Sequence, residues 1–413
     1  MTASELPLIL SRGCGLDVHK DTVVASIKGT DIESQTKTFS TFTLDLHQLV
    51  GWLQNHGITY VAMESTGVYW KPVYHILEEY FHIMLVNARH IKNVPGHKTD
   101  KKDSDRVACR WIAKLLLSGL LKGSFVPDQS IRELRFLHRH RRKLIGMRTT
   151  EKNRLQNILE DANIKLASVV SDVFGVSGVA MIKAIAQGQT DSSVLAGLAK
   201  GSLVKKKNKL IQALNGRVTD HHRFMLQFVL DSIQHINNQI AQLEARMDQY
   251  NMQYREQVQL LQSIPGVSKQ IATGIIAEIG VEMNVFPSHS NLASWAGVCP
   301  GNNESAGKKY SSRTTNGNKY LKTTLVEVAW AATRSKANPI LPDKHRKIAA
   351  RRGQRKATIA IGHKILIAAY HVIRDREPYQ PNTQDRMVME KRRLKRIERL
   401  EKQLSKLKKT SYN

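Results

Sequence analysis

Cysteine is scarce in this sequence, which has three in 413 residues, at positions 14, 109 and 299. Three widely spaced cysteines give neither a disulfide framework nor the paired spacing of zinc ligands, so a disulfide-rich secreted scaffold and a zinc module are both excluded. Long apolar runs are also missing, because the longest apolar-rich stretch, 361–373, carries His and Lys and is too short to cross a bilayer. The first residues lack the pattern of a secretory signal, so we expect a cytoplasmic protein with no membrane partner.

Acidic residues are few as well. The chain has 35 Asp and Glu against 63 Lys and Arg, which gives a formal net charge of +28. Such an excess of positive charge indicates a polyanionic partner, and nucleic acid is the obvious one. The length is typical of two or three domains, and an apolar content of 41% is enough to form their cores.

Short β-branched runs alternate with amphipathic segments in the N-terminal region. We expect strands at 14–19, 22–29, 39–42, 60–64 and 82–86, and helices at 46–53 and 68–80. This alternation predicts an α/β domain, with a sheet covered by helices, over residues 12–125.

The middle of the chain, residues 130–258, reads as long charged helices. Apolar side chains step by three and four residues from Leu226 to Tyr250, which is the heptad pattern of a coiled coil. An earlier segment, 134–158, fits the same frame with interruptions at Arg141, Arg148 and Glu151. Two such helices can pair within one chain or between chains, and we expect a homodimer or homotetramer through this coiled coil. A core helix of a small bundle is the alternative.

A mainly helical unit follows over residues 260–374, and the basic tail, 380–413, has the spacing of an exposed amphipathic helix. The turn at 263–268 resembles that of a helix-hairpin-helix, whose backbone N–H groups can hold a DNA phosphate. An ordinary corner between two helices is an equally good interpretation of that turn.

Four carboxylates form the most informative set. Asp17 interrupts an apolar strand and Glu64 ends another, where a buried charge is costly unless it is paired or bound to metal. Asp100 and Asp103 are three residues apart and share one face if that stretch is helical. Together the four side chains have the oxygen ligands that two Mg²⁺ (or Mn²⁺) ions require for cleavage of a phosphodiester.

Ser305 lies in a polar, Gly-rich segment of the second half of the chain. A hydrolase elbow is rejected there, because the first Gly of G-x-S-x-G and the strand before it are absent. From the chemistry alone, a loop that grips phosphate is favoured over a nucleophilic serine. The candidate nucleic-acid-binding residues are basic side chains near these motifs: Lys98, Lys308, Lys309 and Arg313.

The acidic segments 15–20, 63–67 and 98–103 (GLDVHK, MESTG and KTDKKD) resemble the motifs of the DEDD insertion-sequence transposases of family one-ten, a group that includes the Piv-type DNA invertases. Residues 296–321 are similar to the second conserved domain of the same transposases, whose pattern is Ala-Gly-x-x-Pro, a Ser, then Gly-Asn-x-x-Leu. The two motif sets occur in the expected order, and the resemblance covers about residues 12–125 and 260–374.

This resemblance implies a fold and a chemistry. The N-terminal domain would be RuvC-like, that is RNase H-like, with Asp17, Glu64, Asp100 and Asp103 as metal ligands, while Asp105 falls outside the pattern. Ser305 would be the nucleophile that becomes joined to DNA, which reverses the preference stated above. Group members guided by a non-coding RNA of the element imply an RNA partner beside DNA, in a prokaryotic nucleoid.

Two other functions remain open. A RuvC-like endonuclease would cut branched DNA by two-metal hydrolysis, with Ser305 merely structural. A non-enzymatic DNA-binding repressor is the third possibility, and the presence of all four acids and of Ser305 argues against it.

Overall fold

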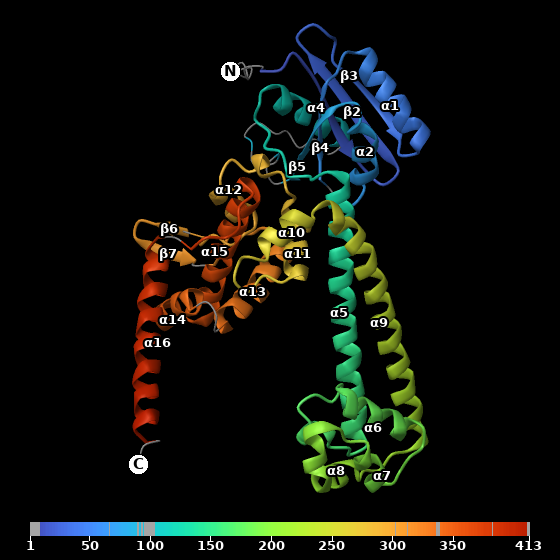
Figure 1. Ribbon diagram of the computed structural model, residues 1–413. Helices are drawn as coiled ribbons and strands as arrows, with labels where there is room; N and C mark the ends of the chain where they lie inside the picture. The colour runs from blue at the N-terminus through green and yellow to red at the C-terminus, as the bar shows by residue number, and fades with distance from the viewer. Residues whose placement is uncertain are drawn as a thin grey trace. The chain divides into compact units, whose positions relative to one another are not determined.

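The computed structural model of the chain describes residues 9–65, 67–88, 91, 94, 104–301, 303–311, 313–335, 339–381 and 383–410. The chain forms two compact units, Met1–Val126 and Pro127–Asn413, each described by itself below (Figure 1). Across the described residues, every helix falls short of the length and apolar character needed to cross a bilayer.

The first unit is built on a five-stranded mixed sheet. Its strands are β1 (Arg12–Val18), β2 (Thr22–Gly29), β3 (Gln35–Ser40), β4 (Tyr60–Glu64) and β5 (His82–Val86). Their order across the sheet is β3-β2-β1-β4-β5. Strand β2 is antiparallel to both of its neighbours, β1 and β3, whereas β4 is parallel to both of its neighbours, β1 and β5. The β-branched runs predicted as strands therefore form one sheet.

Helices cover both faces of this sheet (Figure 1). On one face, α1 (Thr43–Asn55) and α2 (Trp70–Leu77) bury their apolar sides against Leu16 and Met63. On the other face, α4 (Ser104–Leu117) packs Ile112 and Leu116 with Ala62, which neighbours Met63 and so points to the opposite side. The predicted α/β N-terminal region is confirmed.

The third strand lies earlier than predicted. It was expected at 39–42, but it spans Gln35–Ser40, and Phe42 is instead the exposed N-cap residue of α1. Strand β3 lies at the edge of the sheet, where most of its side chains are exposed or half-buried. An exposed edge strand can be polar, so the run QTKTFS lacks the apolar content by which the other strands were predicted.

Two long helices dominate one part of the second unit: α5 (Gln129–Asp161) and α9 (Asp220–Gln253) lie side by side (Figure 1). Asp128 and Thr219 cap their N-termini through side-chain oxygens. Most of the predicted heptad side chains of α9 are buried, and Ile236 and Ile240 pack with Leu144 of α5. Since α5 of the same chain covers this seam, the seam does not itself require a second chain. The coiled coil and the dimer or tetramer stay predictions.

Two of the charged residues that interrupt the α5 pattern pair with α9. Arg141 contacts Glu244 with an N···O distance of 2.6 Å, and Arg148 donates a hydrogen bond of 2.9 Å to the Asn237 side chain. These two interruptions therefore add polar contacts along the same helix pair.

The far end of the helix pair carries a small helical cap with its own apolar core, formed by residues such as Leu155, Ile182 and Leu210. Its elements are η1 (Leu166–Ser168), α6 (Val176–Ala186), α7 (Ser192–Gly197), η2 (Gly201–Lys206) and α8 (Lys207–Leu214).

The rest of the second unit is mainly helical, as predicted. Its elements are α10 (Arg255–Leu261), α11 (Lys269–Ile279), η3 (Met283–Val285), α12 (His289–Trp295), β6 (Asn303–Ser305), β7 (Lys308–Ser311), α13 (Lys319–Arg334), α14 (Ile340–Arg352), α15 (Gln354–Asp375) and α16 (Thr383–Thr410). The predicted turn at 263–268 does join two helices, α10 and α11, and the tail is the helix α16 with Leu394 and Leu400 exposed.

Candidate active site

Strand β1 presents two different faces. Cys14, Leu16 and Val18 point into the apolar core under α1 and α2, so Gly15 and Asp17 point to the opposite face, toward α4. A Cβ atom added to Gly15 would lie 2.2 Å from the carbonyl oxygen of Cys109 and 2.4 Å from the backbone nitrogen of Ala113. Only glycine permits this contact, which lays the backbone of α4 directly on the strand two residues before Asp17.

Glu64 lies beside Asp17 at the end of the neighbouring parallel strand. Leu16 of β1 pairs in register with Met63 of β4, and the next residue on each strand is the acid. Carboxyl ends of parallel strands meet at one edge of a sheet, where ligands commonly bind. The structure thus brings together two of the four predicted acids.

Two further side chains complete a cluster around Asp17. His19 Nε2 is 3.5 Å from Asp17 Oδ2 and 3.4 Å from Asp105 Oδ2. Asp105 lies in the first turn of α4, the helix whose backbone packs directly against Gly15. One ligand atom from each of Asp17, His19 and Asp105 lies within 4.8 Å of the others. These three side chains can hold a divalent metal.

The electrostatics of the cluster favour a cation. Burial raises the pKa of Asp17, and the nearby charges of Asp105 and Glu64 raise it further, while His19 opposes the shift. Burial and the charge of Asp17 also raise the pKa of the Cys109 thiol to about 12, so that cysteine stays a neutral thiol. A half-buried carboxylate with two further acids beside it fits a bound cation, and carboxylate oxygens suit Mg²⁺ or Mn²⁺.

Asp100, Asp103 and Lys98 lie outside the described residues, so their predicted roles are untested. His19 and Asp105 were not predicted as site residues. The signals for them are modest: His19 follows Asp17 by two residues, and Asp105 follows Asp103 by two at the start of a helix.

Ser305 lies at the tip of a β-hairpin, where a polar loop was expected. It ends β6 and pairs with Lys308, the first residue of β7, across a two-residue turn. Ala306 and Gly307 in that turn have φ angles of 50° and 76°, as required by the tight turns that join twisted strands. The Ser305 side chain is exposed at this tip.

Beyond β6 and β7 the two chain segments stay paired as far as Gly297 and Gly317, which form the neck of the hairpin. The described residues of 297–317 are called the serine hairpin below. Gly301 donates a backbone hydrogen bond of 2.9 Å to Arg313, and Thr315 donates one of 3.3 Å to Cys299. At the neck the two backbones touch, since a Cβ on Gly317 would lie 2.3 Å from the nitrogen of Gly297. The position of this neck therefore sets where Ser305 lies.

Basic side chains accompany the serine. Lys308 and Arg313 are exposed on the serine hairpin, whereas the side chain of Lys309 is outside the described residues. Exposed Lys and Arg can neutralise phosphate charge, and contact of these residues with DNA stays a prediction.

Comparison with known protein families decides the identity of the chain. Residues 14–164 match the IS110-type DEDD transposase family, and residues 258–346 match the family described as transposase IS116/IS110/IS902. The chain belongs to the IS110 family of DEDD transposases. Together the two matches cover more than half of the sequence, and no match to a curated protein is found.

Both candidate sites of this transposase lie inside the matched regions: the cluster around Asp17 in the first and Ser305 in the second. Membership shows a protein of DNA transposition and recombination that acts on DNA, and divalent metals are typical of DEDD transposases. The resemblance proposed from the sequence is confirmed.

Proposed function

We propose that this transposase cuts and rejoins DNA with Ser305 as the nucleophile and an acidic cluster as the metal site. The proposed metal ligands are the four predicted acids, Asp17, Glu64, Asp100 and Asp103, and Asp105 and His19 complete the site beside Asp17. The observation that carries the proposal is the gathering of acidic side chains around Asp17, in the region matched by the DEDD family. The exposed position of Ser305 between basic residues, in the second matched region, supports its part in the chemistry.

The residues divide the work as follows. The four acids would hold a divalent metal, which would supply Lewis-acid stabilisation of charge on the phosphate. His19 lies 3.5 Å from Asp17 and helps to orient that carboxylate, in the way that outer residues orient metal ligands. Lys308 and Arg313 neutralise the phosphate that approaches the hairpin tip.

In the proposed reaction, the Ser305 Oγ forms a bond to phosphorus and loses its proton. The bond from phosphorus to the sugar oxygen breaks, and that oxygen takes up a proton and leaves as a strand-end hydroxyl. A hydroxyl of a second strand then attacks the phosphoserine and releases Ser305. One phosphodiester is exchanged for another, so no nucleoside triphosphate is consumed.

We further propose a RuvC-like, RNase H-like fold for the first unit and a guide RNA beside the DNA. The mixed sheet with acids at adjacent strand ends supports the first proposal. The net charge of +28 supports a large polyanionic load. Sequencing of RNA that copurifies with the transposase tests the second proposal.

Trapping tests the nucleophile. The transposase is incubated with element-end DNA and Mg²⁺, denatured, and analysed for a protein–DNA adduct whose peptide is mapped by mass spectrometry. We expect the adduct at Ser305, its loss in Ser305→Ala and Asp17→Asn, and its persistence in Ser311→Ala, the matched change on the opposite strand of the hairpin. An undiminished adduct in Ser305→Ala would disprove the serine assignment.

A RuvC-like endonuclease is the alternative, since an acidic metal cluster alone suffices for hydrolysis. A plasmid assay separates the two functions. Joined strands that depend on Ser305 support recombination, whereas free hydrolysed ends from both wild type and Ser305→Ala support the endonuclease.

A further inference from the structure

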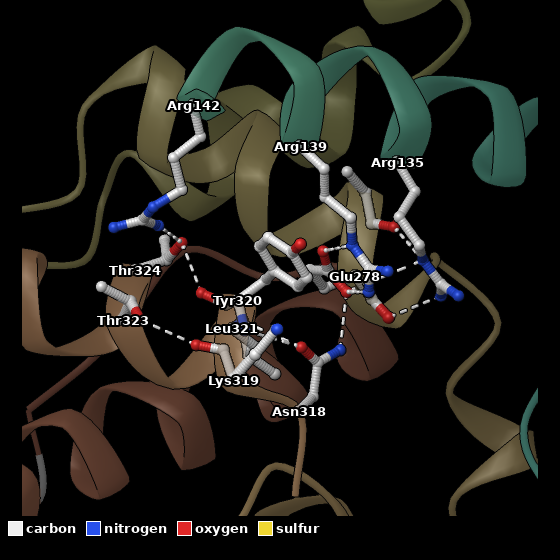
Figure 2. Close-up of polar contacts among 11 residues, drawn as sticks. Arg135, Arg139, Arg142, Glu278, Asn318, Lys319, Tyr320, Leu321, Thr323 and Thr324 are labelled. Atoms are coloured by element: carbon white, nitrogen blue, oxygen red, sulfur yellow. Dashed lines mark hydrogen bonds and ion pairs between the residues drawn. The ribbon is translucent and has the colours of Figure 1, made fainter. Parts of the chain in front are cut away.

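Glu278 on α11 is a charged residue with no exposed surface. Its carboxylate accepts two hydrogen bonds from Arg139, of 2.8 and 2.7 Å, and a third of 2.6 Å from the Asn318 side-chain amide (Figure 2). Burial acts to raise the pKa of Glu278, but Arg139, Asn318 and Arg135 outweigh it and lower the pKa below its usual value. Glu278 is therefore a fixed anion at neutral pH.

Asn318 uses both ends of its amide. The oxygen accepts from the backbone nitrogens of Tyr320 and Leu321, at 3.0 and 3.1 Å, and so caps α13, while the nitrogen donates to Glu278. The residue directly before it is Gly317, which touches Gly297 at the neck of the serine hairpin. One side chain thus joins a buried anion, a helix start and the base of the hairpin.

Three arginines on one face of α5 approach α11 and α13, and two of them, Arg135 and Arg139, contact Glu278. Arg135, Arg139 and Arg142 are four and three residues apart, and all three point toward α11 and α13 (Figure 2). Arg135 donates hydrogen bonds to the backbone oxygens of Ala277 and Glu278, of 2.9 and 2.8 Å. The neck of the serine hairpin is thereby tied through Asn318 and Glu278 to the long helix α5.

We propose that Glu278 and Asn318 are positioning residues for Ser305, an inference that rests on the proposed role of this serine. They act through the hairpin neck and make no contact with the reacting atoms. A buried ion pair contributes little net stability compared with well-packed apolar residues, but in some proteins it specifies one arrangement of its partners, and this is the role we assign to Glu278. Here the enforced arrangement is that of the neck against α5, from which the hairpin ladder extends to Ser305.

The main test uses Asn318→Ser, because serine keeps the cap of α13 but is too short to reach Glu278. Arg142→Ala is the matched control: it removes side-chain contacts of α5 with Thr324 and Glu327 of α13 that do not reach the neck. Full-length proteins are compared for adduct formation, for affinity toward element-end DNA and for thermal unfolding.

We expect Asn318→Ser to slow adduct formation at least tenfold while DNA affinity stays within error, since a misplacement of about 1 Å can reduce a rate on the order of 10²-fold. Its melting temperature should fall by only a few degrees, because the buried carboxylate of Glu278 loses one hydrogen bond and keeps those from Arg139. Arg142→Ala should form the adduct at the wild-type rate. A wild-type rate in Asn318→Ser would overturn the proposal.

Distances measured without the reaction separate this inference from the proposed function. Spin labels at Ser305→Cys and Thr149→Cys, in a Cys299→Ser background, report the hairpin tip relative to α5, and the other two cysteines are buried. We expect one narrow distance distribution in the parent, a broad one with Asn318→Ser and a narrow one with Arg142→Ala. A narrow distribution in Asn318→Ser would refute positioning even if Ser305 is the nucleophile, and an adduct in Ser305→Ala would refute only the proposed function.

A pair of compensating substitutions tests the proposal if Asn318→Ser destabilises the fold. Asn318→Asp keeps a capping oxygen but sets a carboxylate against Glu278, and Glu278→Gln added to it restores one hydrogen bond between the two positions. Inactive Asn318→Asp with recovery in the double variant supports the proposal. Absence of recovery in a double variant that melts like the wild type refutes it.

Discussion

Replacement of Gly15 by Ala tests how the acidic cluster is assembled. The new methyl carbon would lie 2.2 Å from the Cys109 carbonyl oxygen and 2.4 Å from the Ala113 nitrogen, and both atoms belong to the backbone of α4. Neither atom can rotate away. The helix must therefore move by about 1 Å or more to restore an ordinary van der Waals separation.

The displaced helix carries Asp105 at its first turn, so the same shift separates Asp105 from His19 and Asp17. Overpacking of this kind destabilises by about 1–3 kcal/mol. A displacement of about 1 Å near reacting groups reduces a rate on the order of 10²-fold. We expect Gly15→Ala to lower the melting temperature and the rate of adduct formation together, and to weaken Mn²⁺ binding measured by electron paramagnetic resonance.

Gly51→Ala is the matched control, because Gly51 lies in the middle of α1 and nothing is within 4 Å of its added Cβ. That change should raise stability by about 0.5–1 kcal/mol, since alanine favours a helix over glycine. If Gly15→Ala melts like the wild type and binds Mn²⁺ equally well, the close contact between β1 and α4 does not set the site.

Three shorter predictions concern charge. Burial lowers the pKa of His138 to about 4, so as pH falls below about 6.5 this histidine takes up a proton in the unfolded chain but not in the folded chain. About 2 kcal/mol of stability is therefore lost between pH 7 and pH 5. His138→Leu should remove that loss in urea titrations, and an unchanged dependence of stability on pH would contradict this account. Without metal, Asp17→Asn should stabilise the protein by about 1 kcal/mol, because it removes a buried carboxylate, and burial and acidic neighbours raise the pKa of that group. Added Mn²⁺ should raise the melting temperature of the wild type only. A metal-free variant that melts at a lower temperature than the wild type would count against this electrostatic account. Lys308→Ala and Arg313→Ala should each reduce the slope of log affinity for DNA against log salt by about 1, and an unaltered slope would show that neither residue contacts phosphate.

Much of the first unit could be predicted from the sequence, because its buried strands carry β-branched side chains. Asp17 and Glu64 stood out as acids in apolar runs, and the register of β1 with β4 brings them together. Asp105 could not be recognised in this way, since only the packing of α4 onto Gly15 brings it to His19.

The second half was less predictable for a different reason. The serine segment is polar and short of β-branched residues, so it favours a loop, and its two strands form because the Ala306–Gly307 turn adopts positive φ angles. Glu278 gave no signal either. It is the one acid of α11, a helix that also carries Lys269 and Gln270. Its burial depends on Arg139 and Asn318, which are far away in sequence.

Each of the two candidate sites is placed by a close contact between two backbones at a glycine. Asp17 lies two residues beyond Gly15, where strand and helix backbones touch, and the serine hairpin grows from the contact of Gly297 with Gly317. A contact between backbones has no side-chain rotamers through which it can relax, so it fixes position more tightly than a contact between long side chains does. A carboxylate or hydroxyl on a segment fixed by such a contact is held in place with it, and groups that bind metal or react with phosphate must be held within a fraction of an ångström. For this reason substitutions at these glycines, which bear no reactive group, should slow joining on the order of 10²-fold.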